Sequence, residues 1–391
     1  MALGITELCN YNHAMTRRTK DSGELYSVAA AGAGFRHALC QQELFRKALL
    51  DWFDNHARGL PWRTNPRDPY VVWVSEVMLQ QTRVAAVVPY FERFMRRFPT
   101  VRALAQAPVD DVLSAWSGLG YYRRARLLHQ AAQQIEQRFD GVLPHRPEEL
   151  QQLAGVGPYT AAAVASMAHG HDIAVVDGNV IRVIARLLAY REPVDTSAAT
   201  RVIRSVAQTL LDPQQPGKFN EALMELGALQ CTPWAPDCSY CPVVDWCEAH
   251  RNNLASELPV LSEKKKPILL KLSAFVVESS LGWLLYQRRE QGLFGGMWEP
   301  PMVLSGSDEQ RWWVEQLTRW SGAKPRARQA SVRHVLSHRV MHVRVLRCEC
   351  DGEPRGDMPQ TRDYLQARWV NEDELESVAT SSLVRKILDH S

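Results

Sequence analysis

Four cysteines lie close together in the segment CTPWAPDCSYCPVVDWC, with six, two and five residues between successive members. They are Cys231, Cys238, Cys241 and Cys247. Thiols grouped so closely can converge on one metal centre, and a two-residue gap is common in such sites. The alternative of four unrelated buried thiols does not explain the grouping. Because thiolates bind both zinc and iron–sulfur clusters, the spacing alone leaves the metal undecided.

The pattern of apolar residues divides the chain into parts. From residue 42 to 250, apolar positions recur at three- and four-residue spacing, which predicts a mainly α-helical region. The stretch 251–267 loses this periodicity and contains prolines and consecutive lysines, as is typical of a linker. Residues 268–391 predict a smaller α+β domain. Residues 1–41 form an extension that we expect to be disordered.

Local patterns in the second domain predict particular elements. LKLSAFVV and WLLYQRR are expected to form a β-hairpin, and MHVRVLR alternates like a half-buried strand. Between them, Ser307 and Gln310 form a capping-box pattern at the start of a helix, and Gly322 is placed to end that helix.

Composition and charge narrow the class of protein. Charged residues make up 23% of the chain and apolar residues 46%, which is typical of a globular protein. The net charge of +3 permits an anionic partner without requiring one. No apolar run approaches the roughly 18 residues of a membrane span, and the N-terminal stretch, in which Met15 is an alternative start, lacks a convincing export signal. We therefore expect a cytoplasmic protein whose cysteines are thiols or metal ligands.

The segment PEELQQLAGVGPYTAAAVAS predicts a helix–hairpin–helix. A helix over residues 147–154 is followed by a glycine turn and by a second helix that begins at Pro158. The turn consists of Gly155, Val156 and Gly157. Its glycines and the N–H groups of the helix start suit a DNA phosphate. A plain corner between two helices would also use a glycine, so the turn alone leaves both interpretations open.

The cysteine spacing and the glycine turn together resemble the endonuclease III family of DNA glycosylases. This resemblance implies a [4Fe–4S] cluster, and not zinc, on the four cysteines. In that family the position of Tyr159 holds a lysine when the enzyme also cleaves the DNA strand, because an amine forms a Schiff base with the sugar. A tyrosine cannot do so. The resemblance therefore implies base removal without strand cleavage, although Tyr159 could simply fill a gap between helices.

Two carboxylates are candidates for breaking an N-glycosidic bond, which requires an acid for the leaving base and an anion for the cationic sugar. Glu76 interrupts the largely apolar helix YVVWVSEVMLQQT, where burial would raise its pKa toward neutrality. Asp177 follows IAVV and precedes GNVIRVIARL. The simpler interpretations are a Glu76 that faces water and an Asp177 that only caps the next helix.

Several motifs between residues 60 and 247 look like the MutY branch of this family, the adenine DNA glycosylases: LPWR, DPYVVWVSEVMLQQT, GLGYYRRAR, GVGPYT and VDGNVIRV. The resemblance implies that Glu76 donates the proton to adenine and that Asp177 stabilises the cationic sugar. Asn179 matches a polar residue beside that site, and Tyr159 a hydroxyl that positions sugar and carboxylate.

The same resemblance implies that adenine is flipped out of the duplex. Gln81 and Tyr121 match residues that wedge into the vacated space. The Tyr121 ring is followed by arginines that could contact phosphate. The alternative is an aromatic residue buried under the next helix, and this is the interpretation we prefer for Tyr122.

The second domain resembles Nudix-type domains through GLFGGMWEPP. Trp312, Trp313 and Val314 stand where such hydrolases have clustered glutamates for a divalent metal, so catalysis is not expected there. The matching domain of adenine glycosylases recognises 8-oxoguanine. Ser337 and His338 match its lesion-reading loop, and Leu336 departs from the usual phenylalanine. A polar turn before the next strand is the simpler interpretation.

The leading hypothesis is a monofunctional adenine glycosylase that acts on double-stranded DNA with adenine opposite 8-oxoguanine or guanine. The resemblance implies a monomer in the bacterial cytoplasm, with no membrane partner. The alternatives are an endonuclease III-like lyase for oxidised pyrimidines, a non-catalytic DNA-binding protein that carries the cluster, and a nucleotide hydrolase. Tyr159 and the second domain oppose the first, the pair Glu76 and Asp177 opposes the second, and the missing metal carboxylates oppose the third.

Overall fold

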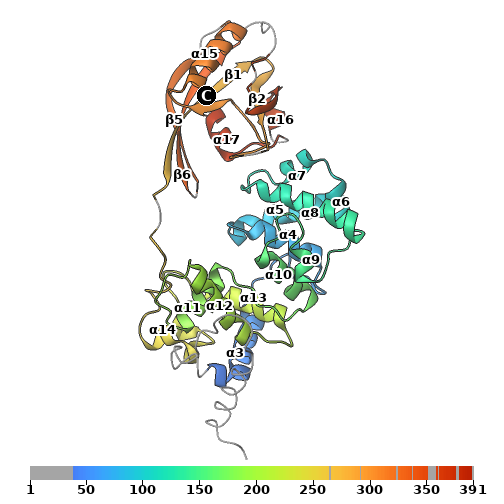
Figure 1. Cartoon of the computed structure of the whole chain (residues 1–391), viewed down its shortest axis with the longest axis vertical. Helices are drawn as coiled ribbons and strands as arrows, with labels where there is room; N and C mark the ends of the chain where they lie inside the picture. Colours follow the sequence, from blue (N-terminus) through green and yellow to red (C-terminus); the bar gives the residue numbers. More distant parts are fainter. Residues whose placement is uncertain are drawn as a thin grey trace, which may run out of the picture. The chain divides into compact units, whose positions relative to one another are not determined.

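The structure is a computed structural model (Figure 1). It describes residues 38–263, 266–290, 292–322, 325–336, 338–350, 358–359, 361–375 and 378–389. Ser337 and most of the predicted N-terminal extension therefore lie outside the described residues. Among the helices in the described ranges, none is long and apolar enough to cross a membrane.

The predicted helical region is helical. Its helices are α3 (Gln42–His56), α4 (Pro69–Leu79), α5 (Val84–Arg97), α6 (Val101–Gln106), α7 (Val109–Ala115), α8 (Arg123–Phe139), α9 (Pro147–Leu150), α10 (Pro158–His169), α11 (Gly178–Leu187), α12 (Ser197–Leu210), α13 (Pro216–Leu229) and α14 (Glu248–Arg251). Proline at the first position begins α4, α9, α10 and α13, because its fixed φ suits a helix start and its missing N–H is not needed there.

Helix α9 is shorter than the sequence predicts. It ends at Leu150, whereas we expected the helix to continue to residue 154. Beyond it, Leu153 N–H donates to Leu150 O and Val156 N–H to Leu153 O, so the chain continues in tight i to i+3 turns. The turn itself is as predicted: Gly155 has a φ of 73°, which glycine adopts without strain.

The chain forms two compact units, and the helical region contributes to both. The first unit comprises residues 38–80 and 138–263 of the described chain. Its core lies between α3, α11, α12 and α13, with Phe45, Leu49, Ile184 and Phe219 almost wholly buried. Helix α10 packs on α4 and α13. Gly217 permits the last of these contacts, because a Cβ there would meet the backbone oxygen of Ser166 at 2.6 Å.

The second unit comprises residues 81–137, which carry α5 to α8 up to Gln137, and the described residues from Lys266 onward. The later part is a mixed sheet. Its strands are β1 (Ile268–Ser279), β2 (Gly282–Arg288), β3 (Trp298–Glu299), β4 (Met302–Leu304), β5 (Arg326–Leu336), β6 (Arg339–Glu349) and β7 (Tyr364–Val370). The order is β3-β2-β1-β6-β5, with β4 on β1 and β7 on β2. The strands β1 and β6 are parallel, and the other pairs are antiparallel.

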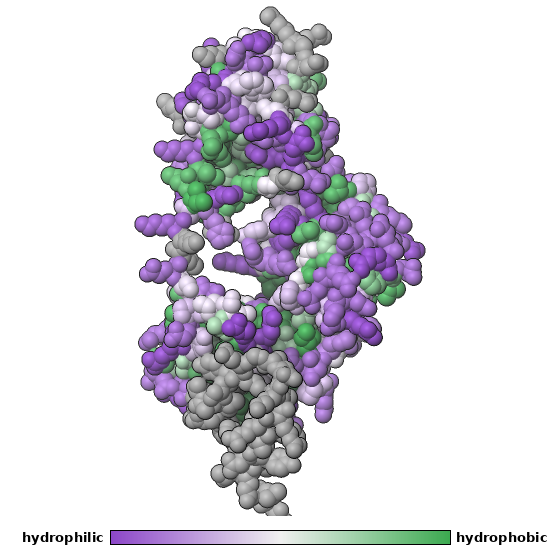
Figure 2. All heavy atoms as spheres, in the orientation of Figure 1, coloured by the Kyte–Doolittle hydropathy of each residue, from purple (hydrophilic) through white to green (hydrophobic). Residues whose placement is uncertain are grey.

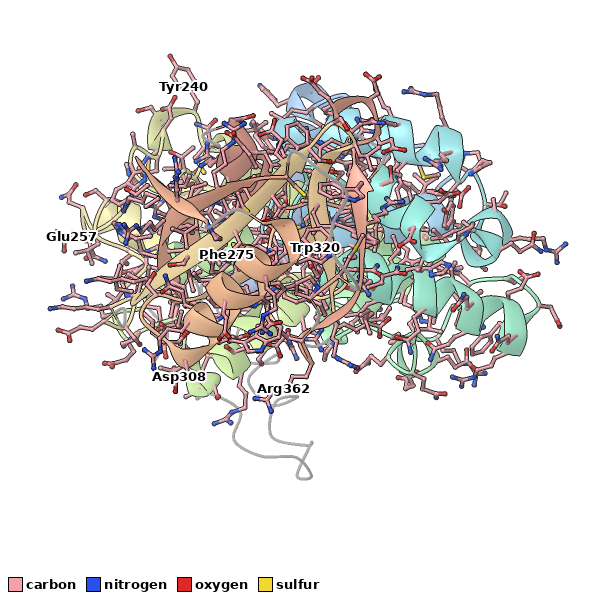
Figure 3. All side chains as sticks on the ribbon, turned by 90° about the horizontal axis from the view of Figure 1, so that it is seen from above. Tyr240, Glu257, Phe275, Asp308, Trp320 and Arg362 are labelled. Atoms are coloured by element: carbon pink, nitrogen blue, oxygen red, sulfur yellow. The ribbon has the colours of Figure 1, made fainter. Side chains whose placement is uncertain are left out.

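Both faces of this sheet are covered by helices, because side chains along β1 alternate between them. Phe275 and Val277 pack with α15 (Asp308–Ser321), and Ala274 and Val276 pack with α17 (Ser382–Asp389). Figure 1 shows both helices beside the sheet, and Figure 3 labels the buried residues Phe275 of β1 and Trp320 of α15. The short helix α16 (Glu372–Leu375) follows β7.

The local predictions for this domain are confirmed. The strands β1 and β2 form the predicted antiparallel hairpin, and MHVRVLR lies in β6. Ser307 Oγ accepts a hydrogen bond from Gln310 N–H at 3.1 Å, and Gly322 ends α15 with a φ of 77°. The Gln310 side chain accepts from Gly306 N–H, one residue earlier than in a standard capping box.

The face of the molecule drawn in Figure 2 is mostly hydrophilic, with apolar residues in scattered groups. Two large aromatic side chains of the cysteine segment are nevertheless exposed, Trp234 at 92% and Tyr240 at 79%. Tyr240 projects outward in Figure 3.

Candidate active site

Glu76 is a buried carboxylate on α4, as the sequence predicts. Asp68 caps this helix by accepting hydrogen bonds from the N–H groups of Tyr70 and Val71. The Glu76 side chain lies among apolar residues of the helix, and only 6% of the residue is exposed. Burial raises the pKa of Glu76 to about 7, because the charged form loses its hydration. The carboxyl group can therefore hold a proton near neutrality.

Tyr159 contacts Glu76 directly. Helix α10 begins at Pro158, so Tyr159 stands in its first turn, and its hydroxyl donates a hydrogen bond to Glu76 Oε2 at 2.8 Å. The hydroxyl also lies 3.8 Å from the Met224 sulfur on α13. Burial and the nearby carboxylates raise the pKa of Tyr159 well above its usual value, so the phenol keeps its proton and acts as the donor.

Asp177 and Asn179 form the second part of the site, at the start of α11. Asp177 is the N-cap, and its Oδ1 accepts from Val180 N–H at 2.7 Å. Its Oδ2 accepts from the Asn179 side-chain amide at 2.8 Å. Burial raises the pKa of Asp177, and these two hydrogen bonds oppose that rise because they stabilise the anion.

The structure brings these four residues into one site. The negative charge of Asp177 raises the pKa of both Glu76 and Tyr159, which places the carboxylates within electrostatic reach of each other. Of the two, Glu76 is the more deeply buried and Asp177 has the hydrogen bonds of a helix start. This asymmetry suits an acid and an anion acting side by side.

A buried ion-pair network, which sequence reasoning missed, lies behind the site. Glu221 and Glu225 of α13 accept from arginines that precede α4: Arg58 to Glu225 at 2.7 Å, Arg63 to Glu225 at 3.0 Å and to Glu221 at 3.2 Å, and Arg67 to Glu221. The charge on Glu221 also raises the pKa of Glu76. The sequence signal that could have revealed this network is the presence of two glutamates in α13, a helix whose residues are mostly buried.

The glycine turn leaves room for an approaching ligand. A Cβ built on Gly157 would meet no atom within 4 Å, and α10 begins there without a side-chain cap. Val156 differs from its neighbours, since its side chain is buried and its N–H donates to Leu153 O. The backbone available to a phosphate is therefore that of Gly157 and the first turn of α10.

The predicted wedge residues belong to the second unit, whereas the carboxylates belong to the first. Gln81 and Tyr121 both have positive φ angles, 59° and 53°, and Tyr121 is 49% exposed. Tyr122 is buried, as expected, and its hydroxyl donates to Thr380 O at 2.9 Å. Of the arginines after Tyr121, Arg123 is exposed, whereas Arg126 pairs with Glu290 at 3.5 Å.

The four cysteines lie within electrostatic reach of one another, and Cys231, Cys241 and Cys247 pack against the core of the first unit. Burial and the charge of Cys231 raise the pKa of Cys238, Cys241 and Cys247. The pKa of Cys241 rises to about 12 and that of Cys247 to about 11. In the described parts of the chain, no three Cys, His, Asp or Glu side chains surround one point as ligands of a single ion. Arg186 donates to Cys231 Sγ at 3.2 Å.

Helix α11 connects the cysteine segment to Asp177, a link for which the sequence carried no local signal. Arg182 donates to the Asn179 side chain, to Cys231 O and to Gly227 O, each at 2.8 Å. Gly227 allows this close packing, because a Cβ there would meet Asn179 Cβ at 2.6 Å. Asn179 is thus fixed from both sides, by Asp177 and by Arg182.

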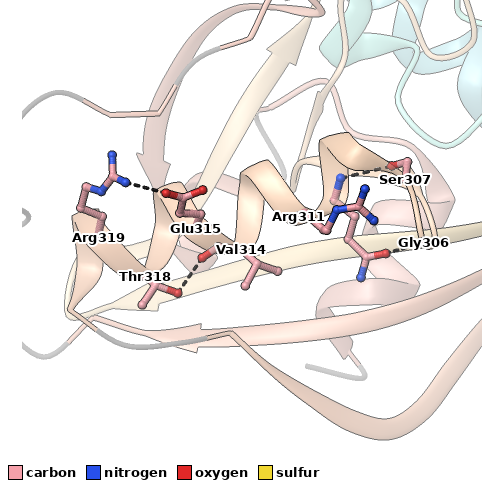
Figure 4. Close-up of a pocket in the computed structure, with 8 residues that line it drawn as sticks. Gly306, Ser307, Arg311, Val314, Glu315, Thr318 and Arg319 are labelled. Carbon is pink, nitrogen blue, oxygen red and sulfur yellow. Dashed lines mark hydrogen bonds and ion pairs between the residues drawn. The ribbon is translucent and has the colours of Figure 1, made fainter.

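In the sheet of the second unit, His338 is exposed between β5 and β6, and its carbonyl accepts from Ile268 N–H at 2.9 Å. Helix α15 has Trp313 in the core, and its acidic residues are Asp308 and Glu309 in the first turn and Glu315, which pairs with Arg319. A hollow on α15 (Figure 4) is lined by residues of this helix and of the turn before it, and no predicted site residue contributes to it.

Comparison with known proteins agrees with this arrangement. Residues 74–210 match the family described as HhH-GPD superfamily base excision DNA repair protein, and residues 273–390 match the NUDIX domain. The adenine DNA glycosylase of Rattus norvegicus is 36% identical over 400 residues, which cover 88% of this chain and 77% of the relative. The chain belongs to the adenine DNA glycosylase family.

The human adenine DNA glycosylase is 35% identical over 399 residues, which cover 88% of this chain and 73% of the human protein. Among solved structures, a thermostable thymine-DNA glycosylase aligns with a TM-score of 0.49 and 27% identity, over 54% of this chain and 97% of its own. The predicted fold class, a helix–hairpin–helix glycosylase region followed by a Nudix-like domain, is confirmed by the two family matches. The chain is therefore a DNA glycosylase of base excision repair.

Proposed function

We propose that this glycosylase removes adenine from double-stranded DNA in which adenine lies opposite 8-oxoguanine or guanine. It would hydrolyse the N-glycosidic bond and leave the strand whole. The observation that carries this proposal is the hydrogen bond from Tyr159 to the buried, protonatable Glu76, with Asp177 within electrostatic reach. Family membership supports adenine as the base.

In the proposed mechanism, Glu76 gives its proton to the leaving adenine as the bond to the sugar breaks. Asp177 stabilises the positive charge that develops on the sugar, and its hydrogen bonds from Val180 and Asn179 favour the anion needed for this role. Water then adds to the sugar, and the proton that it loses restores the acid form of Glu76. Tyr159 orients the Glu76 carboxyl group, and Asn179 orients Asp177.

The lysines of residues 38–263 support the proposal that the DNA strand is left whole. Between residues 38 and 263, the sequence contains lysine only at positions 47 and 218. Lys47 of α3 pairs with Asp51 at 2.5 Å and Lys218 of α13 pairs with Asp54 at 2.7 Å, so both line a surface hollow that includes none of the site residues. A Schiff base requires an amine at the sugar, and Tyr159 supplies a phenol there.

For DNA binding, we assign a phosphate to the end of the predicted turn of Gly155, Val156 and Gly157, at the backbone of Gly157 and the first turn of α10. The exposed Tyr121 and Gln81 would fill the gap that the flipped adenine leaves, since an exposed aromatic ring can stack on bases. Residues 42–250 would form the glycosylase region and, after the linker 251–267, residues 268–391 the domain that recognises 8-oxoguanine, with Ser337 and His338 in its reading loop.

The cysteines fit a [4Fe–4S] cluster by their chemistry. Four thiolates within reach of one another repel unless positive charge lies among them, and thiolates are the ligands that iron–sulfur clusters take. Cys231, Cys238, Cys241 and Cys247 would hold it. The bound cluster would tie this segment together, and Arg186 would add a hydrogen bond to the Cys231 sulfur.

We further infer that the enzyme works as a monomer in the bacterial cytoplasm, where its DNA substrate lies. The DNA duplex with its mispair is the partner that this site requires, and no membrane enters the proposal.

The test uses a labelled duplex with one adenine opposite 8-oxoguanine. After incubation with the protein, strand breaks are compared before and after hot alkali. Breaks only after alkali are expected, because base removal leaves an abasic site that alkali cleaves. Breaks before alkali would contradict the role given to Tyr159. No breaks after alkali, with the duplex still bound, would indicate a non-catalytic DNA-binding protein.

A further inference from the structure

Two residues of the second unit adopt a backbone conformation that residues other than glycine rarely adopt. Gln81 has a φ of 59° and Tyr121 a φ of 53°. Such conformations are strained and persist only where surrounding contacts hold them, typically at functional sites. Both residues are also exposed, which leaves their side chains available to a ligand. Some other group must therefore hold these two loops in place.

Arg124 contacts both loops. Its Nη2 atom donates to Thr82 Oγ1 at 3.2 Å, next to Gln81, and to Gly120 O at 3.2 Å, next to Tyr121. Its guanidinium carbon lies 5.3 Å from the centre of the Tyr121 ring and 5.5 Å from that of Trp116.

The buried Trp116 makes this arrangement rigid. Its ring is wholly buried, and its indole N–H donates to Gly120 O at 3.1 Å, the same carbonyl that accepts from Arg124. The arginine is therefore supported by a fixed aromatic ring, while it supports the exposed ring of Tyr121. Only the planar, delocalised guanidinium can stack on the rings and donate a directed hydrogen bond at the same time.

We propose that Arg124 is a positioning residue that locks the Gln81 and Tyr121 loops into one rigid wedge for the DNA duplex. This inference deepens the proposed function and rests on it. Arg124 does not serve as a phosphate contact, because its side chain is half-buried and engaged with Thr82, Gly120 and the two rings. Its neighbour Arg123 is exposed and takes no part in these contacts of Arg124, so it is the matched control.

The test is a double-mutant cycle with R124K, Y121A and the double variant, in the full-length protein. The duplex carries 2-aminopurine opposite 8-oxoguanine, and the fluorescence rise on binding reports base flipping. Single-turnover release of adenine is measured in parallel. If Arg124 acts through Tyr121, R124K and Y121A should each reduce flipping and release about tenfold, and the double variant should be no worse than Y121A alone.

Three outcomes would overturn the inference. R124K could behave like the wild type, as it would if only a positive charge near phosphate mattered. The effects of R124K and Y121A could multiply, as expected for independent sites. The control R123A could couple to Y121A as strongly as R124K does. Thermal unfolding is recorded for each variant, and R124Q, which keeps a side-chain donor, is tested in the same cycle in case R124K does not fold.

The same experiment separates this inference from the proposed function. Fluorescence reports flipping and not bond cleavage, so the coupling between Arg124 and Tyr121 is measured even without catalysis. A wild-type protein that flips the base but releases no adenine would contradict the proposed function. A wild-type protein that releases adenine, with no coupling in the cycle, would contradict the role of Arg124 alone.

Discussion

Two buried glutamates, one in each unit, have a raised pKa for the same reason but lie beside different neighbours. Burial raises the pKa of Glu76 in α4 to about 7, and it does the same for Glu299 in β3. Glu299 has partners that stabilise its charge, because it forms an ion pair with Arg288 and accepts from the Tyr364 hydroxyl at 3.1 Å. Glu76 faces Asp177 and Glu221, whose charges oppose its own, and receives one hydrogen bond from Tyr159.

The difference teaches that burial alone does not identify a catalytic acid. Glu299 is held by a cation and a phenol, so it serves the packing of the sheet. Glu76 lies near the carboxylates of Asp177 and Glu221, which favour its protonated form, and protein folds tolerate such an arrangement mainly where it has a function. The neighbours of a buried carboxyl group, and not its pKa, distinguish the two cases.

The largest effect is expected from removing the Glu76 carboxylate, with the Glu299 carboxylate as the comparison. E76Q should lower single-turnover adenine release by between about 10²- and 10⁴-fold, since it removes the general acid and keeps the shape. E299Q is the matched control and should release adenine at the wild-type rate while it unfolds at a lower temperature, because Arg288 loses its buried partner. Equal losses of activity in the two variants would remove the distinction between these sites.

The second largest effect on adenine release is expected from neutralising Asp177, the anion of the site. D177N should reduce adenine release by about 10²- to 10³-fold, the cost of losing one electrostatic contact to the transition state. Asparagine caps helices as well as aspartate does, so the start of α11 should be preserved. Circular dichroism and duplex affinity check the fold. An active D177N would show that Asp177 is only a helix cap.

A smaller effect is expected at the link between the cysteine segment and the site. R182Q removes the contacts to Asn179 and Cys231, so Asp177 should be less well oriented and adenine release about tenfold slower, with duplex affinity unchanged. The control is R201Q, an exposed arginine of α12. If R182Q weakens duplex binding as much as it slows adenine release, Arg182 orients the cysteine segment and not Asp177.

The smallest effects are shifts of pKa in opposite directions. The Tyr159 hydrogen bond lowers the pKa of Glu76, so Y159F should move the high-pH loss of activity to higher pH. The charge of Glu221 raises that pKa, so E221Q should move the loss to lower pH. Rates at five or more pH values measure both shifts. Shifts in the same direction would mean that neither neighbour acts on Glu76 as described.

Much of the site could be predicted from the sequence because its elements are local. A glutamate within the apolar run YVVWVSEVMLQQT indicates burial by itself, and Asp177 before GNVIRVIARL indicates a helix start. The contact of Tyr159 with Glu76 could not be derived in this way, because it depends on the packing of α10 against α4. The family resemblance pointed to it instead.

The arginines were the main omission. Arg63 and Arg182 are long, charged side chains that look solvated in sequence, and Arg124 was among the arginines expected to contact phosphate, yet each is engaged inside its unit. Their partners are distant carboxylates, backbone carbonyls and a hydroxyl, which leave no periodic pattern. The length of α9 was also wrong, because turns of the i to i+3 type replace its last residues without any change in composition.

The central claim is that Glu76 holds a proton at neutral pH and gives it to the leaving base. It is tested most directly by the single-turnover rate of adenine release between about pH 5.5 and 9. Since the raised pKa of Glu76 is about 7, the rate should be flat at low pH and fall about tenfold for each unit above pH 7. A rate that stays constant or rises through pH 7 in the wild-type enzyme would contradict the claim.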